Sequence, residues 1–365
     1  MKILVIQDFV RSGGTERQSI LLANAFAAAG HLTTLLTFRP AGALDATVAP
    51  NVIRRALQPF DLKLDWFAPG LVSEVRRCTP DIILCMGRMA NCYAGSLQGE
   101  FPGVVVLATM RTGKKLPSLY FRSLANVRHV VTNSHDGKDT LIRRYSVPPE
   151  RISVIHNALV FPPESIDPLA RETVRARHGA SDTTTVLLCV AMFRPEKNHR
   201  GLIETIAALP PSFDWQLWLA GVGPSRPACE QFVAKAQVDA RVKFLGFQRD
   251  PSALYRAADV AVHASASEAL SNFLIEAQAH GLPAVVYQAQ GMDECFDPGR
   301  TGWAVPRGDP AAFRAAILRL ANEPLADRIS RSVIARDFAR DRFDPGRQVA
   351  AYLELFQRLL SLSAR

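Results

Sequence analysis

The sequence predicts an α/β protein made of two doubly wound domains in tandem. Short runs of β-branched residues alternate with amphipathic stretches of helical period along most of the 365 residues. This alternation is typical of βαβ units and of a parallel sheet. It stops once, at residues 158–183, and then restarts. The length also favours two domains, because a single domain usually has about 100–200 residues.

The first half begins with the apolar run Lys2–Ile6, which we expect to be the first strand. Helical period follows in Glu16–Ala29 and returns in Leu71–Cys78. Short apolar runs predict the other strands of this half: Leu32–Thr37, Asp81–Cys85, Val104–Thr109, Val130–Asn133 and Ser153–Ile155.

Residues 158–183 are rich in Pro, Asp, Glu and Ser, and we interpret them as a linker with one helix, Leu169–His178. The strands expected after it are Thr185–Val190, Gln216–Ala220, Lys243–Leu245, Val260–His263 and Ala284–Tyr287. The expected helices are His199–Leu209, Cys229–Ala236, Ser252–Ala257, Phe273–His280 and Ala311–Leu320. The final helix, Gln348–Leu362, could pack locally or return to the first domain. We therefore expect domains at 1–165 and 166–345, with a helix at 346–365 returning to the first.

Composition limits the compartment and the partners. The cysteines form no CxxC pair and no disulfide framework, so we expect reduced thiols and no zinc site. No signal peptide or stretch of ~20 apolar residues is recognisable, which favours a cytoplasmic protein. Residues 1–165 hold 19 Lys and Arg against 12 Asp and Glu. This excess favours an anionic partner such as a phosphate-bearing substrate, a membrane surface or nucleic acid, although a merely solvated surface is the alternative.

Two glycine turns follow predicted strands. Gly13-Gly14, in the turn that runs from Arg11 through Ser12 to Arg17, opens a helix. Adjacent glycines there allow close approach of a ligand, and helix-start amides favour anions. The second turn, residues 221–226, has Arg226 where a dinucleotide fingerprint needs its third glycine. That turn disfavours a dehydrogenase.

Two charged patterns of the second half point to a phosphate-bearing ligand. Arg194 and Lys197 lie on one strand-to-helix loop, where two cations suit a diphosphate and the charge that develops on a leaving group. Glu268 and Glu276 flank the start of an apolar helix, whose amides favour a phosphate and whose carboxylate could accept ribose hydroxyls. Each of these two charged pairs, taken alone, could also lie on a solvated surface without binding a ligand.

The ordered combination resembles the retaining family-4 glycosyltransferases, also called group 1. The matching segments are Gly13–Glu16, Thr132–Ser134, Ile155–Asn157, Arg194–Asn198, Phe244–Gly246, Ala257–Val260, the pair Glu268 and Glu276, Gly281–Pro283 and Thr301-Gly302. The resemblance implies the GT-B fold, in which two Rossmann-like domains face each other across a cleft. It also implies an N-terminal acceptor domain and a C-terminal nucleotide-sugar domain.

The resemblance implies site residues as well. Arg194 and Lys197 would bind the donor diphosphate and assist its departure, Glu268 would face the donor sugar, and Glu276 would hold the ribose. The remaining donor contacts would come from Gly13, Gly14, Phe247, Leu270, Ser271, Asn272 and Phe273. The family needs no metal or other cofactor, and we expect a UDP-sugar rather than a GDP-sugar as the donor substrate.

The chain departs from the family pattern at four positions. Many relatives carry arginine at the position of Met192 and a histidine near Arg111, and here Arg111 could contact the donor instead. Relatives usually have Asn-Gly and Glu-Gly where this chain has alanine at Ala158 and Ala269. Alanine is disfavoured at positive φ, so these turns are expected to differ in detail.

The segment Arg111–Arg122 interleaves cations with Leu, Tyr and Phe. It could lie on an anionic membrane surface, or it could pack its apolar face inward. We expect transfer of a hexosyl or N-acetylhexosaminyl group to a lipid-linked, lipopolysaccharide or polysaccharide acceptor, with peripheral contact at the inner face of the plasma membrane. A GT-B epimerase and a non-catalytic nucleotide-sugar binder remain alternatives. Nucleic acid is disfavoured because the basic residues form no recognised module.

Overall fold

The computed structural model describes residues 1–11, 13–162 and 168–363. The chain divides into two compact units, Met1–Ala158 with Pro345–Arg365, and Leu159–Asp344. The boundary predicted between residues 165 and 166 lies outside the described residues, as does Ser12 of the first glycine turn. The second unit begins at Leu159, and the last helix of the chain belongs to the first unit.

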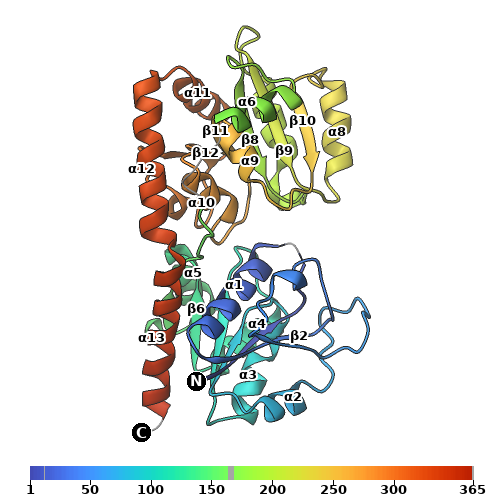
Figure 1. The fold of residues 1–365 in the computed structure, drawn as a ribbon, viewed down its shortest axis with the longest axis vertical. Coiled ribbons are helices and arrows are strands. Elements are labelled where there is room, and N and C mark those ends of the chain that lie inside the picture. The colour runs from blue at the N-terminus through green and yellow to red at the C-terminus, as the bar shows by residue number, and fades with distance from the viewer. Residues whose placement is uncertain (12, 163–167, 364–365) are drawn as a thin grey trace. The chain divides into compact units, whose positions relative to one another are not determined.

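The first unit is built on a seven-stranded parallel sheet in the order β3-β2-β1-β4-β5-β6-β7. Its strands are β1 Lys2–Gln7, β2 Leu32–Thr37, β3 Ile53–Ala56, β4 Ile82–Cys85, β5 Val105–Met110, β6 His129–Thr132 and β7 Ile152–Val154. Its α-helices are α1 Gly14–Ala28, α2 Leu71–Cys78, α3 Ala90–Glu100, α4 Ser118–Asn126, α5 His135–Tyr145 and α13 Pro345–Ser363. Helices cover both faces of this sheet (Figure 1).

Alternation along β1 shows why this sheet needs helices on both sides. Ile3 and Val5 lie in the core that α1 and α13 complete, whereas Leu4 and Ile6 lie in the core beneath α2, α3, α4 and α5. Successive side chains of a strand point to opposite faces, so a strand that is apolar throughout must be covered twice. The continuous apolar run that predicted the strand thus also required two helical layers.

The second unit holds a six-stranded parallel sheet in the order β10-β9-β8-β11-β12-β13. Its strands are β8 Thr185–Val190, β9 Trp215–Ala220, β10 Val242–Gly246, β11 Val260–His263, β12 Ala284–Tyr287 and β13 Gly302–Val305. Its α-helices are α6 Pro168–Arg177, α7 His199–Ala207, α8 Arg226–Lys235, α9 Ser252–Ala257, α10 Asn272–Ala279, α11 Pro310–Ala321 and α12 Leu325–Phe343. One core lies against α9, α10 and α12, and the other against α7, α8 and α11.

The prediction of two doubly wound parallel-sheet domains is confirmed, and most predicted elements agree with the structure within a few residues. Two of the elements that the sequence pattern missed, β3 and α12, bury little apolar surface. The edge strand β3 carries two arginines, and α12 buries Ala335, Ala339 and Phe343 among otherwise exposed or half-buried side chains. Two of these are small, so α12 shows no broad apolar stripe.

Within the described residues, no helix has both the length and the apolar character needed to cross a bilayer.

Candidate active site

The strand order of the second unit reverses between β8 and β11. Loops that leave such a pair of parallel strands diverge to opposite faces, and the crevice between them is the usual ligand site of a doubly wound sheet. The loop after β8 carries Arg194 and Lys197, and the loop after β11 carries Glu268. The topology therefore brings together the charged residues that the sequence predicted.

Main-chain hydrogen bonds hold the two loops against each other. The carbonyl oxygen of Glu196 accepts hydrogen bonds from Ala266 N, at 2.6 Å, and from Ser265 Oγ, at 3.2 Å. A 3₁₀ turn, η3 Pro195–Lys197, ends at Asn198, whose φ of 50° reverses the chain. The Asn198 side chain then accepts from Gly201 N and caps α7. Lys197 is thus fixed between a turn and a helix start.

The Gly221–Gly223 turn supports this arrangement from β9. Its two glycines have φ of 148° and 152°. A Cβ on Gly221 would lie 2.0 Å from Ala191 O, and one on Gly223 would lie 2.4 Å from Phe193 O. These contacts leave no space for a side chain, so the glycines serve close packing of two loops. This role is consistent with the missing dinucleotide fingerprint.

Glu268 is the centre of the charge cluster. Its Oε1 accepts hydrogen bonds from Lys197 Nζ and from Nε2 of His263, the latter at 2.9 Å. Burial by itself raises the pKa of Glu268, but the hydrogen bond from His263 and the charge of Lys197 outweigh burial and lower the pKa to about 2. Glu268 is therefore a carboxylate at neutral pH.

Arg194 and Lys197, the two cations predicted on this loop, lie in different environments. Arg194 is exposed and forms no ion pair within residues 1–11, 13–162 and 168–363. Lys197 is partly buried and paired with Glu268. Met192, where many relatives carry arginine, is 36% exposed beside them. The loop thus presents one solvated cation and one anchored cation.

Glu276 lies on α10, as predicted, and its carboxylate accepts a hydrogen bond from Tyr255 Oη at 2.6 Å. The buried Tyr255 ring stacks on His280 and on Phe273, with ring-centroid distances of 4.8 and 6.1 Å. These two contacts hold the phenol, which in turn restricts Glu276. Tyr255 was not predicted, because nothing in the linear sequence connects it with α10.

The first turn of α10 holds the other predicted donor contacts. Leu270, Ser271 and Phe273 are buried and Asn272 is half-buried. Ser271 is the N-cap residue, and its N–H donates to Cys295 Sγ at 3.4 Å. Phe247 follows β10 as a 49% exposed ring. The structure thus offers an exposed aromatic face and a helix start, which are suitable for a base and a phosphate.

In the first unit, Gly13 caps α1 with a negative φ, and Gly14 is the first helical residue. A Cβ on Gly13 would lie 2.4 Å from Glu16 Oε2, so the absence of a side chain makes room for a carboxylate at the helix start. Arg111 Nη1 donates to Asn157 Oδ1, and Nη2 donates to Tyr352 Oη at 2.7 Å. Arg111 therefore joins β5 to α13.

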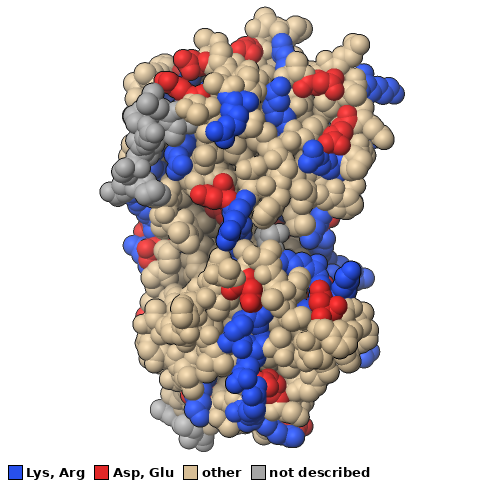
Figure 2. Space-filling model, turned by 45° about the vertical axis from the view of Figure 1, so that its right-hand side comes forward, with Lys and Arg blue, Asp and Glu red and all other residues tan. Residues whose placement is uncertain are grey.

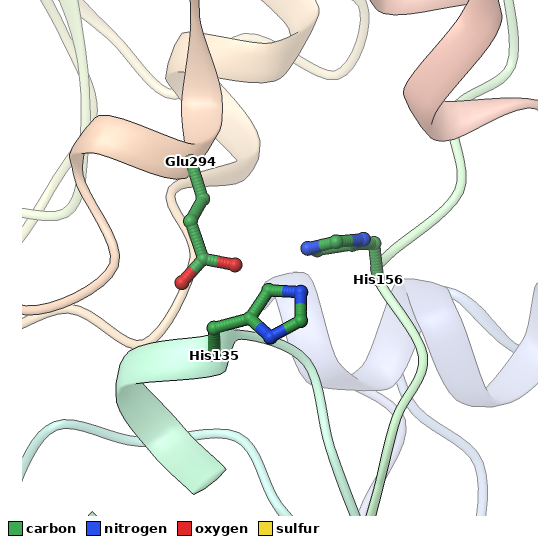
Figure 3. A group of neighbouring side chains, drawn as sticks. All are labelled: His135, His156 and Glu294. Atoms are coloured by element: carbon green, nitrogen blue, oxygen red, sulfur yellow. The ribbon is translucent and has the colours of Figure 1, made fainter. Parts of the chain in front are cut away.

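Three further polar groups escaped sequence reasoning. His263 ends a strand that is otherwise apolar, and a polar residue at the carboxyl end of a buried strand is a signal that could have found it. His135 begins α5 and His156 follows β7, and their ring centroids lie 5.8 Å apart (Figure 3). These two are far apart in sequence and have no metal-ligand spacing, so no pattern connects them.

Comparison with protein families identifies the chain. The model "Glycosyltransferase Family 4" matches residues 12–159, and the model "Glycosyl transferases group 1" matches residues 184–323. Together they account for most of the chain. The chain belongs to the family-4 glycosyltransferases. The family-4 membership that its motifs suggested is thereby confirmed.

Curated relatives match this family-4 chain over part of its length. The lipopolysaccharide core biosynthesis glycosyltransferase LpsE of Rhizobium meliloti is 30% identical over 185 residues, which are 50% of this chain and 52% of the relative. The D-inositol 3-phosphate glycosyltransferase of Corynebacterium kroppenstedtii is 30% identical over 212 residues, or 54% and 46% of the two chains. The chain spans about half the length of the curated relatives it matches.

Solved structures support the GT-B fold of this family-4 member over nearly its whole length. HepE of Anabaena, in complex with UDP, has a TM-score of 0.83 at 20% identity and covers 98% of this chain and 100% of its own. WaaG, a glycosyltransferase involved in lipopolysaccharide biosynthesis, has a TM-score of 0.75 at 18% identity and covers 95% and 98%.

Two of the departures from the family pattern are turns in which alanine stands where relatives usually have glycine. Neither Ala158 nor Ala269 has a positive φ, so each turn avoids the conformation that the usual glycine permits. Close to the second, Gly291 has a φ of 69°, and a Cβ on it would lie 1.7 Å from Ala269 O. The two segments can therefore approach closely at Ala269 because Gly291 has no side chain.

Proposed function

We propose that this chain is a retaining, metal-independent glycosyltransferase that uses a nucleotide sugar, a UDP-sugar rather than a GDP-sugar. A hexosyl or N-acetylhexosaminyl group would pass to a lipid-linked, lipopolysaccharide or polysaccharide acceptor. The observation that carries the proposal is the meeting of Lys197, Glu268 and the start of α10 at the strand-order reversal of the second unit. Cations, a carboxylate and a helix N-terminus at a switch point are suited to a sugar diphosphate.

Lys197 and Arg194 are proposed to stabilise the departing diphosphate. An ammonium group has three donor hydrogens, and one of those on Lys197 is used by Glu268. Two remain for phosphate oxygens, and the exposed guanidinium of Arg194 offers a bidentate face. Fixed cations that stabilise charge on a leaving group can replace a metal ion in that role.

The two glutamates are proposed to hold the two sugars of the donor. Glu268 accepts a hydrogen bond from a hydroxyl of the transferred sugar. Glu276 accepts hydrogen bonds from the ribose hydroxyls, beside the Tyr255 phenol. Phe247 stacks on the base. The amides at 270–273, apart from that of Ser271, which donates to Cys295 Sγ, bind the distal phosphate. Gly13, Gly14 and Arg111 remain predicted contacts of the donor. A donor phosphate oxygen is proposed to assist deprotonation of the acceptor.

The relatives support the choice of donor and acceptor class. HepE of Anabaena was solved with UDP and with UDP-glucose. LpsE of Rhizobium meliloti is named for lipopolysaccharide core biosynthesis, and TarM of S. aureus was solved with fondaparinux, alpha-GlcNAc-glycerol and UDP. A UDP-sugar and a glycan or lipid-linked acceptor are the reactants that this group suggests.

Replacement of Lys197 by alanine tests the proposal directly. Turnover of the donor should fall by orders of magnitude while the chain stays folded, because the leaving group loses a fixed cation. Arg200→Ala is the matched control, since Arg200 is an exposed cation on α7 that pairs with Glu204. Near-normal turnover in the Lys197 variant would remove this assignment. The active donor is first found by a thermal-shift screen of nucleotide sugars, since binding to the folded state stabilises it.

Product analysis separates the alternatives. Incubation with donor alone that yields a changed sugar still attached to the nucleotide indicates an epimerase. Stabilisation by the donor without hydrolysis or transfer to any glycan indicates a non-catalytic binder. Retention is tested by the anomeric configuration of the transferred sugar, and a metal requirement by turnover in the presence of EDTA.

Peripheral contact with an anionic membrane is proposed through residues 111–122. Leu119 and Phe121 on α4 are 60% and 44% exposed, whereas Tyr120 and Leu124 pack inward. Helix α4 therefore packs one face inward and leaves Leu119 and Phe121 exposed, and this exposed apolar pair supports the proposed contact. Basic side chains also lie at several places on the face that Figure 2 shows, interspersed with acidic ones.

Flotation with anionic liposomes tests this contact. Replacement of Lys114, Lys115 and Arg122 by glutamate should abolish co-flotation, because each basic residue near an anionic surface contributes about 1 kcal/mol. Unchanged flotation of the triple variant would count against membrane contact through this segment.

A further inference from the structure

The Glu268 carboxylate uses its two oxygens differently. Oε1 accepts from both Lys197 Nζ and His263 Nε2. Oε2 accepts no hydrogen bond from any residue in the described part of the chain, and it is not among the buried polar atoms that lack a partner. One oxygen is therefore held by the protein while the other stays accessible.

His263 is rigidly held and can donate only from Nε2. The side chain is 1% exposed at the end of β11. Nε2 lies 2.9 Å from the carboxylate, and Nδ1 lies 3.8 Å from Cys189 Sγ. Phe273 packs edge-on at 5.5 Å between ring centroids. A neutral imidazole carries one N–H, and the carboxylate requires it on Nε2.

The electrostatic surroundings keep the imidazole neutral. Burial lowers the pKa of His263, although the hydrogen bond to Glu268 opposes this. The other titratable groups that face the cluster are Lys197 from η3, His199 from α7, Cys189 from β8 and Cys295 from η4 Asp293–Cys295. Burial lowers the pKa of His199 and raises those of the two thiols. Lys197 is therefore the charged partner and His263 a neutral donor.

We propose that His263 is a positioning residue: by binding Oε1 it orients Glu268 so that Oε2 meets a hydroxyl of the donor sugar. This inference rests on the proposed function, because it requires a sugar beside Glu268. If Lys197 were the only donor, the carboxylate of Glu268 could still rotate, because its one hydrogen bond would come from a flexible side chain. A second, rigid donor on the same oxygen restricts that rotation, and a hydrogen bond between a fixed donor and an ion has a defined direction.

Two variants of His263 test the proposal. His263→Leu removes the donor and replaces the ring with an apolar side chain, whereas His263→Gln supplies an amide N–H donor at similar reach. Cys189→Ala is the control, since it alters only the neighbour of Nδ1. The readouts are kcat/KM for the sugar nucleotide, its pH profile, and the affinity for UDP, which lacks the sugar.

We expect kcat/KM to fall roughly 10- to 100-fold in His263→Leu, as for loss of a hydrogen bond to a charged group. The acidic limb of the profile should move to higher pH, because Glu268 loses a partner that favours its charged form. UDP affinity should be unchanged, and His263→Gln should recover most of the activity. Wild-type turnover in His263→Leu, an equally impaired His263→Gln, or a parallel loss of UDP affinity would each overturn the proposal.

A spectroscopic measurement separates this inference from the proposed function. In ¹⁵N-histidine-labelled protein, His263 should show a protonated Nε2 whose resonance shifts in Glu268→Gln. An unprotonated Nε2, or a resonance that ignores the Glu268 substitution, overturns the positioning inference whether or not any donor is turned over. If the wild type turns over no sugar nucleotide while the resonance behaves as expected, the proposed function fails and the bond from His263 to Glu268 stands.

Discussion

The sharpest physical prediction concerns the charge of Glu268. Its pKa is lowered from 4.5 to about 2, because the hydrogen bond from His263 and the charge of Lys197 outweigh the effect of burial. Each pKa unit corresponds to about 1.4 kcal/mol. A carboxyl group with a lowered pKa contributes stability above its unfolded pKa and loses it as pH falls through its folded pKa. Glu268 should therefore contribute about 3 kcal/mol at pH 7 and about 1 kcal/mol at pH 3.

Replacement of Glu268 by glutamine isolates this contribution. Glutamine has nearly the same shape and does not titrate, so the difference in unfolding free energy between wild type and variant cancels the titration of groups that do not interact with Glu268. Urea unfolding is measured between pH 7 and pH 3 by tryptophan fluorescence in a Trp66→Phe background. Trp66 is the one tryptophan of the sequence in the first unit, so the remaining three report on the second. This matters because two units can unfold in separate transitions.

The difference between wild type and Glu268→Gln should shrink by about 2 kcal/mol between pH 7 and pH 3. A difference that stays constant across this range would show that Glu268 titrates alike in the folded and unfolded chain. The argument that His263 and Lys197 lower the pKa of Glu268 would then be refuted.

Three more changes test the packing around the sites. Arg175→Met should destabilise the second unit by roughly 3 kcal/mol, because the buried guanidinium binds three carbonyl oxygens and an aspartate. A loss of unfolding free energy below about 1 kcal/mol, measured in urea, would contradict this. Gly223→Ala should cost about 1–3 kcal/mol and lower turnover, since its Cβ would meet Phe193 O; an unchanged urea midpoint would disprove the close contact. Tyr352→Phe should destabilise the first unit by about 1–3 kcal/mol, because Arg111 loses one of its two acceptors and keeps only Asn157 Oδ1. The measurement is circular dichroism in urea, and wild-type stability would exclude this link.

Much of the fold followed from local pattern alone. Strands such as Thr185–Val190 and Val260–His263 were predicted at their observed bounds, because a short, continuous, β-branched apolar run is typical of a buried strand of a parallel sheet. Elements with little buried apolar surface, such as α12, left no comparable signal. Arg194, Lys197, Glu268 and Glu276 were recognised because residue type and spacing around strand ends are visible in the sequence.

Only the tertiary structure decided what these residues touch. The reversal of strand order puts β8 beside β11, and so pairs Lys197 with Glu268 across 71 positions of the chain. The same folding places His263 against Glu268 and brings α13 to Arg111. Local sequence determines which segments become strands and helices, because side-chain periodicity acts over a few residues. Which strand ends become neighbours depends on how whole layers cover one another, and that is a property of the complete chain.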